Sequence, residues 1–150
     1  MLRKILILGA TCVAVISLSS PLHAADAQQK AALASFHSLL DGLGKRDKAA
    51  MLATVLPGAS GTFIREGKAR QMTIEALADA IAKPGPDTYE ERISHPLVRV
   101  DRDLAVVWAP FQFFLNGKLD HCGTDIATLV LLDGRWLITS IEDNQRKPCV

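Results

Sequence analysis

The side chains best suited to acid–base chemistry are Asp125, Glu142 and His121, which we take as the catalytic candidates. Turn signals at Asn116-Gly117 and Asp133-Gly134 predict two-residue hairpins, and these hairpins set which strand residues face each other. In that register Asp125 lies opposite Glu142. Because two neighbouring carboxylates repel, the pKa of one is expected to rise, which suits a general acid or base.

A structural interpretation of the same side chains stays open. The two carboxylates could lie solvated at the open end of the fold, neutralised by Arg146 or Arg92. His121 precedes Asp125 by four residues, which is roughly 13 Å along a strand. Only a ligand or a water molecule could therefore bridge His121 and Asp125, and His121 could equally be a histidine of the rim.

The same register predicts a face of mixed polarity. Strand side chains alternate, so this face is apolar at one end and carries the acids, the histidine and an amide at the other. Two tryptophans on it could be part of the core or a stacking platform for a flat ligand. The candidate ligand-binding residues are Trp108, Gln112, Leu129, Trp136, Ile138 and Ser140, together with His37 from the first helix.

The opposite face is also largely apolar, and helices can cover only one face in so small a chain. An uncovered apolar face predicts a partner sheet, most simply that of a second copy, and hence a homodimer through the outer face. A single β-bulge would shift the register by one residue and exchange the two faces. The outer residues in this register include Val107, Phe111, Phe113, Ile126 and Val130.

Composition and motifs exclude several functions. A formal net charge of +1 over 150 residues, without a block of Lys or Arg, argues against nucleic-acid binding, and a 49% hydrophobic content argues against disorder. The sequence contains no short metal-ligand spacing, nucleophile motif, phosphate loop or dinucleotide-binding glycine pattern. We therefore expect neither a metal nor a cofactor.

The predicted elements place helices before strands. Apolar periodicity predicts helices over 28–43 and 47–56 and a third from the Thr73 N-cap to Ile81, with a small hairpin over 62–71. From Tyr89 onward the period changes to two, and this predicts strands over 90–100, 104–115, 119–132 and 135–143. The order predicts an α+β domain with three N-terminal helices on one face of a curved antiparallel sheet.

The N-terminus has the pattern of a secretory signal over residues 1–24. Arg3 and Lys4 precede an apolar run over 5–18 that is short for a membrane span, and small residues allow cleavage after Ala24 or Ala27. An uncleaved anchor and a lipoprotein are the alternatives. We expect a domain over 25–150 that is exported, periplasmic or secreted, and free of the membrane after cleavage.

Two cysteines, Cys122 and Cys149, remain in the predicted mature chain. A pair of cysteines in an exported protein favours a disulfide, which would fix the C-terminal tail. Two free thiols are the alternative.

The strand series resembles the nuclear transport factor 2-like superfamily, which includes ketosteroid isomerase, scytalone dehydratase and polyketide cyclases. The resemblance covers about 28–143 and is carried by residues 98–108, 111–118, 121–125 and 133–138, the last reading Asp-Gly-Arg-Trp-Leu-Ile. It implies a cone-shaped sheet, a cavity between its concave face and the helices, and dimerisation through the sheet. The isomerases' helical tyrosine has no counterpart, since Tyr89 lies outside the first helix, so no reaction is transferred.

Two functions follow from these observations. The first is an exported protein that binds a small apolar or mixed-polarity molecule, with acid–base isomerase, dehydratase or cyclase activity as its extension. The second is a non-catalytic homodimeric interaction module whose cone is filled by its own side chains. The volume of the cavity distinguishes the two.

Overall fold

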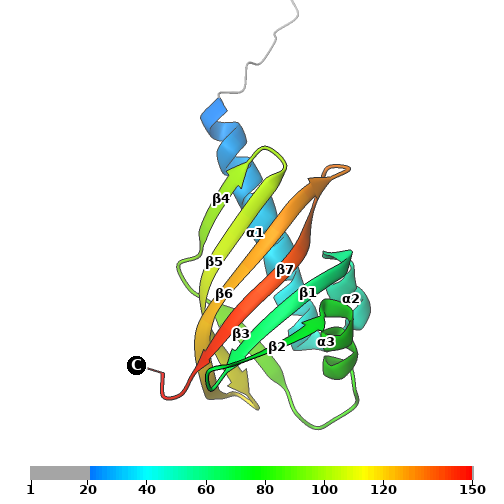
Figure 1. Cartoon of the computed structure of the whole chain (residues 1–150), viewed down its shortest axis with the longest axis vertical. Helices are drawn as coiled ribbons and strands as arrows, with labels where there is room; N and C mark the ends of the chain where they lie inside the picture. Colours follow the sequence, from blue (N-terminus) through cyan, green and yellow to red (C-terminus); the bar gives the residue numbers. More distant parts are fainter. Residues whose placement is uncertain (1–20, 150) are drawn as a thin grey trace, which may run out of the picture.

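A computed structural model describes residues 21–149, so the predicted signal lies, up to residue 20, outside the described residues. Within that range the chain forms three helices and seven strands (Figure 1). Helices α1 and α2 come first, and α3 lies between the second and third strands. The helices are α1 Pro21–Lys45, α2 Lys48–Leu52 and α3 Ile74–Ile81. The strands are β1 Val55–Arg65, β2 Lys68–Thr73, β3 Tyr89–Ile93, β4 Leu97–Asp101, β5 Leu104–Leu115, β6 Lys118–Leu132 and β7 Arg135–Arg146.

The seven strands form one curved, unclosed sheet, so the α+β class is confirmed. The strand order is β2-β1-β7-β6-β5-β3, and β4 also pairs with β5. The predicted antiparallel meander is present in β5, β6 and β7, whereas β1 joins the sheet by parallel pairing with β7. The turn predictions are confirmed, because Asn116 and Asp133 have positive φ values of 53° and 50° and each precedes a glycine with positive φ.

The predicted strand over 90–100 is two strands, β3 and β4, which both pair with β5. The interruption lies at residues 94–96, where His95 has a φ of 45° and Pro96 has no N–H to donate to a ladder. The Ser94 N–H still donates to the Pro110 carbonyl at 2.8 Å. This break separates the two short strands along the edge of the sheet.

Two β-bulges shift the register that the turns predict. Between β5 and β6 the pairs Phe113–His121 and Phe114–Leu119 leave Asp120 as an extra residue. Between β6 and β7 the pairs Thr128–Ser140 and Leu129–Ile138 leave Thr139 as an extra residue. Beyond each bulge every partner moves by one position, so the predicted pairing of Asp125 with Glu142 is wrong. The pairs Leu129–Ile138 and Leu131–Trp136 lie between the Asp133-Gly134 turn and the second bulge, and they keep the register that this turn sets.

Helix α1 runs along one face of the sheet, behind it in the view of Figure 1. Its apolar side, with Phe36 1% exposed and Leu39 3%, packs into the core. Two polar contacts hold it to β7: Ser35 Oγ donates to the Trp136 carbonyl at 2.8 Å, and Trp136 Nε1 donates to Gln28 Oε1 at 2.9 Å. Among residues 21–149, no helix is both long enough and apolar enough to cross a bilayer.

Helices α2 and α3 pack against each other and beside β1, next to the C-terminal part of α1 (Figure 1). Thr73 caps α3 as predicted, since its hydroxyl accepts from the Ala76 N–H at 3.1 Å. Asp47 caps α2 in the same way, accepting from the Ala50 N–H at 3.0 Å. The three helices thus place apolar side chains opposite the inner face of β1, β6 and β7.

Candidate functional site

A cavity of about 310 Å³ lies between the helices and the inner face of the sheet. Most of its wall is apolar, with three phenylalanines and two methionines. Its polar groups come almost entirely from the strands. The lining residues are Phe36, Leu39, Leu40, Leu43, Met51, Phe63, Arg65, Arg70, Met72, Leu77, Ile81, Glu91, Phe113, His121, Asp125, Ile141 and Asp143.

Three acidic side chains meet at this wall. Asp125 on β6 lies directly opposite Asp143 on β7, and Glu91 reaches the group from β3. Asp125 is 4% exposed, and its carboxyl group is near enough to that of Glu91 for each to shift the pKa of the other. Asp125 Oδ2 is buried and has no hydrogen-bond partner among the described residues. Two carboxyl groups can share a hydrogen bond only when one of them carries a proton.

The surroundings of Glu91 and Asp125 favour that proton. Burial raises the pKa of Asp125 well above its usual range, and the charges of Glu91 and Asp143 raise it further. Burial, together with the charge of Asp143, raises the pKa of Glu91 to about 7, while the interactions with Asp125 and Arg65 oppose the rise. Burial and mutual repulsion therefore favour at least one protonated carboxyl group in this pair.

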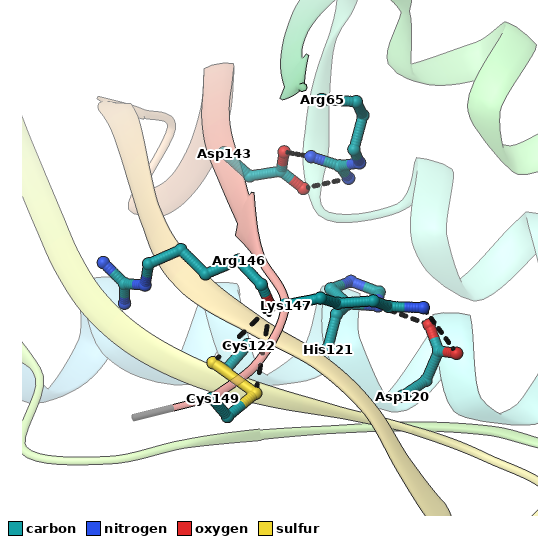
Figure 2. Close-up of polar contacts among 8 residues, drawn as sticks. All are labelled: Arg65, Asp120, His121, Cys122, Asp143, Arg146, Lys147 and Cys149. Atoms are coloured by element: carbon teal, nitrogen blue, oxygen red, sulfur yellow. Dashed lines mark hydrogen bonds and ion pairs between the residues drawn. A yellow bond between two sulfur atoms is a disulfide. The ribbon is translucent and has the colours of Figure 1, made fainter. Parts of the chain in front are cut away.

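Arg65 neutralises the third acid. It lies at the end of β1 and forms a two-pronged ion pair with Asp143, with Nη2 2.8 Å from Oδ2 and Nη1 bonded to Oδ1 (Figure 2). The carboxylate of Asp143 raises the pKa of the guanidinium by hydrogen bonding first and by charge second. Because this pair is internally neutral, the net charge of the wall depends on the Glu91–Asp125 pair, on His121 and on Arg70.

His121 also lines the cavity and lies on the same side of the sheet as Asp125, four residues before it on β6. Its ring stacks on Phe113 with centroids 4.8 Å apart, and Phe111 meets it edge-on at 5.7 Å. Its Nδ1 lies 2.8 Å from Asp120 Oδ2. The ring is therefore held from two directions and is 13% exposed.

The structure places the predicted site residues in three locations. Asp125 and His121 line the cavity. Leu129, Trp136 and Ile138 lie on the inner side of the sheet but are packed in the core under α1, outside the cavity wall. The others point away: Trp108, Gln112, Ser140 and Glu142 on the outer side of the sheet, and His37 at the exposed side of α1.

The bulges explain these corrections. Beyond Thr139, Glu142 pairs with Ile126. Asp143 therefore occupies the position opposite Asp125 that was predicted for Glu142. Beyond Asp120, Phe113 replaces Gln112 opposite His121. Trp108, predicted on the inner face, is 47% exposed, because the buried Val107 and Ala109 on either side of it point inward. The predicted faces of β5 are therefore exchanged.

Helical geometry explains why His37 does not line the cavity. The residues that reach the cavity from α1 are Phe36, Leu39, Leu40 and Leu43, which recur at the spacing of one helical face. His37 lies one residue, or about 100° around the helix, from Phe36. Its prediction as a cavity residue is wrong.

Sequence reasoning missed Glu91, Arg65 and Asp143. Each nonetheless leaves a signal, because each charged residue continues an apolar alternation. Glu91 lies between Tyr89 and Ile93, and Arg65 follows Phe63 at the same spacing of two. A charge inside an inward-facing apolar row is the pattern that indicates a buried polar site.

The predicted disulfide is confirmed. Cys122 on β6 is bonded to Cys149 beyond β7, with their Cα atoms 5.7 Å apart. In the part of the chain that the structure describes, no three His, Cys, Asp or Glu side chains are arranged to hold a metal ion. The chemistry that the cavity wall can supply with its own side chains is proton donation, proton acceptance and hydrogen bonding.

Solved structures share this fold at low identity. An NTF2-like protein of unknown function from Shewanella baltica OS155 superposes with a TM-score of 0.63 at 16% identity, covering 86% of this chain and 98% of that one. A protein named "Putative Scytalone Dehydratase" from Novosphingobium aromaticivorans gives a TM-score of 0.66 at 12% identity, covering 80% and 85%. No curated protein matches the chain.

A family profile adds the assignment. The profile described as "Putative lumazine-binding" matches residues 27–141, which is most of the chain and includes β1 to β6 and much of β7. This family is nuclear transport factor 2-like, so the resemblance seen in the sequence is confirmed. The chain belongs to the family described as "Putative lumazine-binding", within the nuclear transport factor 2-like proteins.

Proposed function

We propose that the protein binds a small, neutral, largely apolar molecule in a cone-shaped pocket and exchanges protons with it through Asp125 and Glu91. The observation that carries this proposal is the pair of neighbouring carboxyl groups, with the buried Asp125 Oδ2 unpartnered among the described residues, in the wall of an apolar cavity of about 310 Å³. A cavity of that size also disfavours the alternative of a cone filled by its own side chains.

The charges of the wall support a neutral ligand. Arg65 is already paired with Asp143, and the other arginine of the wall, Arg70, is exposed on β2. An anionic ligand would meet the partly ionised Glu91 in a medium of low polarity, where repulsion is strong. A carbonyl oxygen, in contrast, can accept the proton that Asp125 holds.

The comparisons support the same class of molecule. Lumazine, in the family's description, is a flat bicyclic compound with carbonyl groups, and the neighbour named as a dehydratase would also require proton transfer. In the proposed reaction Asp125 donates a proton to a carbonyl oxygen, and ionised Glu91 accepts a proton from the carbon beside it. The product is an enol, and reversal returns the ketone.

The test uses two probes of similar shape, 2-acetylnaphthalene and 2-naphthoate. We expect the neutral ketone to bind and the carboxylate to bind at least tenfold more weakly, as measured by quenching of protein fluorescence or by calorimetry. In deuterium oxide the protein should also accelerate deuterium incorporation into the acetyl methyl group. Equal binding of both probes, or none of the ketone, would contradict the proposed ligand class.

Two matched variants distinguish the acid of the cavity from an acid on the outer side of the sheet. Asp125→Asn removes the donated proton and should abolish the accelerated exchange. Glu142→Gln changes an acid on the outer side of the same sheet and should leave binding and exchange unchanged. Loss of exchange in both variants would show that the effect is not specific to the cavity.

We also infer that the outer face of the sheet forms a homodimer. Leu97 and Trp108, which pair across β4 and β5, are 58% and 47% exposed, and Leu104 is 58% exposed. Exposed apolar residues of this size on one face favour a partner surface. We expect a dimer in analytical ultracentrifugation that Trp108→Glu converts to a monomer; a wild-type monomer at micromolar concentration would refute it.

Export is the proposed location. Its support is the Cys122–Cys149 bond, because disulfides persist in oxidising compartments such as the periplasm. Expression of the full chain in a bacterium, followed by fractionation and mass measurement, should give a periplasmic product that begins after Ala24 or Ala27. A full-length product in the cytoplasm would contradict export.

A further inference from the structure

The residues that follow β7 return to β6 and contact it at two positions, one on either side of His121. Cys149 is bonded to Cys122, and Lys147 Nζ donates to Asp120 Oδ1 at 2.9 Å. His121, between those two β6 residues, lines the cavity. Figure 2 shows the disulfide and the Lys147–Asp120 contact on either side of His121. We call residues 147–149 the strap.

The bulge at Asp120 makes the contact with His121 possible. In a regular strand, neighbouring side chains point to opposite faces. As the extra residue, Asp120 departs from that alternation, and its Oδ2 comes to lie 2.8 Å from His121 Nδ1. Both oxygens of Asp120 are thus engaged, one by the imidazole and one by the strap.

The protonation of this pair follows from its partners. Hydrogen bonds from His121 and then Lys147 lower the pKa of Asp120, so Asp120 is a carboxylate and can only accept. His121 Nδ1 must therefore carry the proton in the bond. The nitrogen that remains available to the cavity, Nε2, is then an acceptor in the neutral ring.

We propose that the strap is a redox-sensitive positioning device, in which the Cys122–Cys149 disulfide keeps Lys147 on Asp120, and Asp120 in turn holds His121 as a proton acceptor facing the cavity. Asp120 and Lys147 are positioning residues, since they act through His121. The inference rests on the proposed function only in giving His121 a ligand to act on.

Opening the disulfide should change His121 Nε2 from a hydrogen-bond acceptor into a donor toward the cavity. A dithiol reductant delivers two electrons and two protons, which break the sulfur–sulfur bond and leave two cysteine thiols. The reductant itself becomes a cyclic disulfide. Lys147, whose side chain is 53% exposed, then loses its tether, and the 32% exposed Asp120 can turn to solvent. Without its carboxylate partner, the neutral ring reverts toward the Nε2–H tautomer of free histidine, which offers the cavity a donor.

The test reads the tautomer directly by ¹⁵N NMR of the imidazole at a pH where the ring is neutral, with His121→Gln to assign the signal. In the oxidised protein we expect the Nδ1–H form. Reduction with dithiothreitol and Lys147→Met should each lower the ratio of Nδ1–H to Nε2–H by roughly tenfold, the scale of one charge-assisted hydrogen bond. Asp120→Asn should lower it with the disulfide intact.

Lys118→Met is the matched control, because Lys118 is an exposed lysine of the same strand with no ion pair among residues 21–149. It should leave the ratio unchanged. An Nε2–H ring in the oxidised protein, or a ratio that neither reduction nor Lys147→Met alters, would overturn the proposal. No ligand is present in this measurement, so its failure is distinguishable from failure of ligand binding, and Lys147→Met keeps the disulfide if the reduced protein unfolds.

Discussion

Replacing Glu91 with Gln should change how the stability of the protein depends on pH. Burial raises the pKa of Glu91 from its ordinary 4.5 to about 7, so folding favours its protonated form. The stability that this group contributes is fully present below about pH 4.5 and is lost as the pH rises through about 7. At about 1.4 kcal/mol per pH unit, the difference corresponds to about 3 kcal/mol.

The assay is urea unfolding of the wild type and of Glu91→Gln, with the disulfide intact, between pH 4.5 and 8.5. The free energy of unfolding of the wild type should fall relative to the variant by about 3 kcal/mol over this range. Removing the charge of Glu91 also lowers the pKa of Asp125 in the variant, and this change acts in the same direction. Parallel profiles for the two proteins would refute the reasoning.

Glu90→Gln is the control, since Glu90 is the preceding residue on β3 and points the other way. Arg92 Nε lies 2.6 Å from Glu90 Oε1, and this hydrogen bond lowers the pKa of Glu90. The pH dependence of Glu90 is therefore opposite in sign to that of Glu91. The stability that Glu90 contributes is present above its unfolded pKa and is lost as the pH falls through its lower folded pKa. Between pH 5 and 8.5 this variant should run parallel to the wild type.

Further predictions concern the packing around the cavity. Phe36→Ala should lower the free energy of unfolding by about 3–5 kcal/mol in urea titration, because the ring is 1% exposed. Gly123→Ala should prevent stable folding, seen as loss of the cooperative thermal transition, because a methyl group there would collide with the Asn144 carbonyl and the Phe111 ring. Arg65→Met should cost about 1–2 kcal/mol by leaving Asp143 unpaired, and Asp143→Asn in the same chain should recover most of that cost. Reduction of Cys122–Cys149 should lower the thermal midpoint, through a loss of roughly 3 kcal/mol.

Turn chemistry and periodicity were sufficient to predict most of the fold. The positive φ that Asn116 and Asp133 tolerate set both long hairpins, and β5 has the predicted bounds of 104 and 115. The parallel pairing of β1 with β7 could not be read locally, because it joins segments about eighty residues apart that no turn connects. Strand β1 also begins at Val55, earlier than the hairpin signal.

The candidate site was less predictable because it depends on two bulges. Asp125 and His121 were placed on the correct face, but a one-residue slip at Thr139 replaced Glu142 by Asp143. No residue type marks these bulges in the sequence; in the structure, Thr139 is accommodated by hydroxyl contacts with Thr128 at 2.8 Å. Glu91 comes from an edge strand whose approach to Asp125 is set by the curvature of the whole sheet.

The central claim, that Asp125 keeps a proton at neutral pH inside the cavity, can be measured by infrared spectroscopy of the protein at pH 7. Because Glu91, with a pKa of about 7, is also partly protonated at this pH, the account predicts a carbonyl stretch of protonated carboxyl groups that is weakened in Asp125→Asn and unchanged in Glu142→Gln. A spectrum with only carboxylate bands, or one in which Asp125→Asn removes nothing, would contradict it.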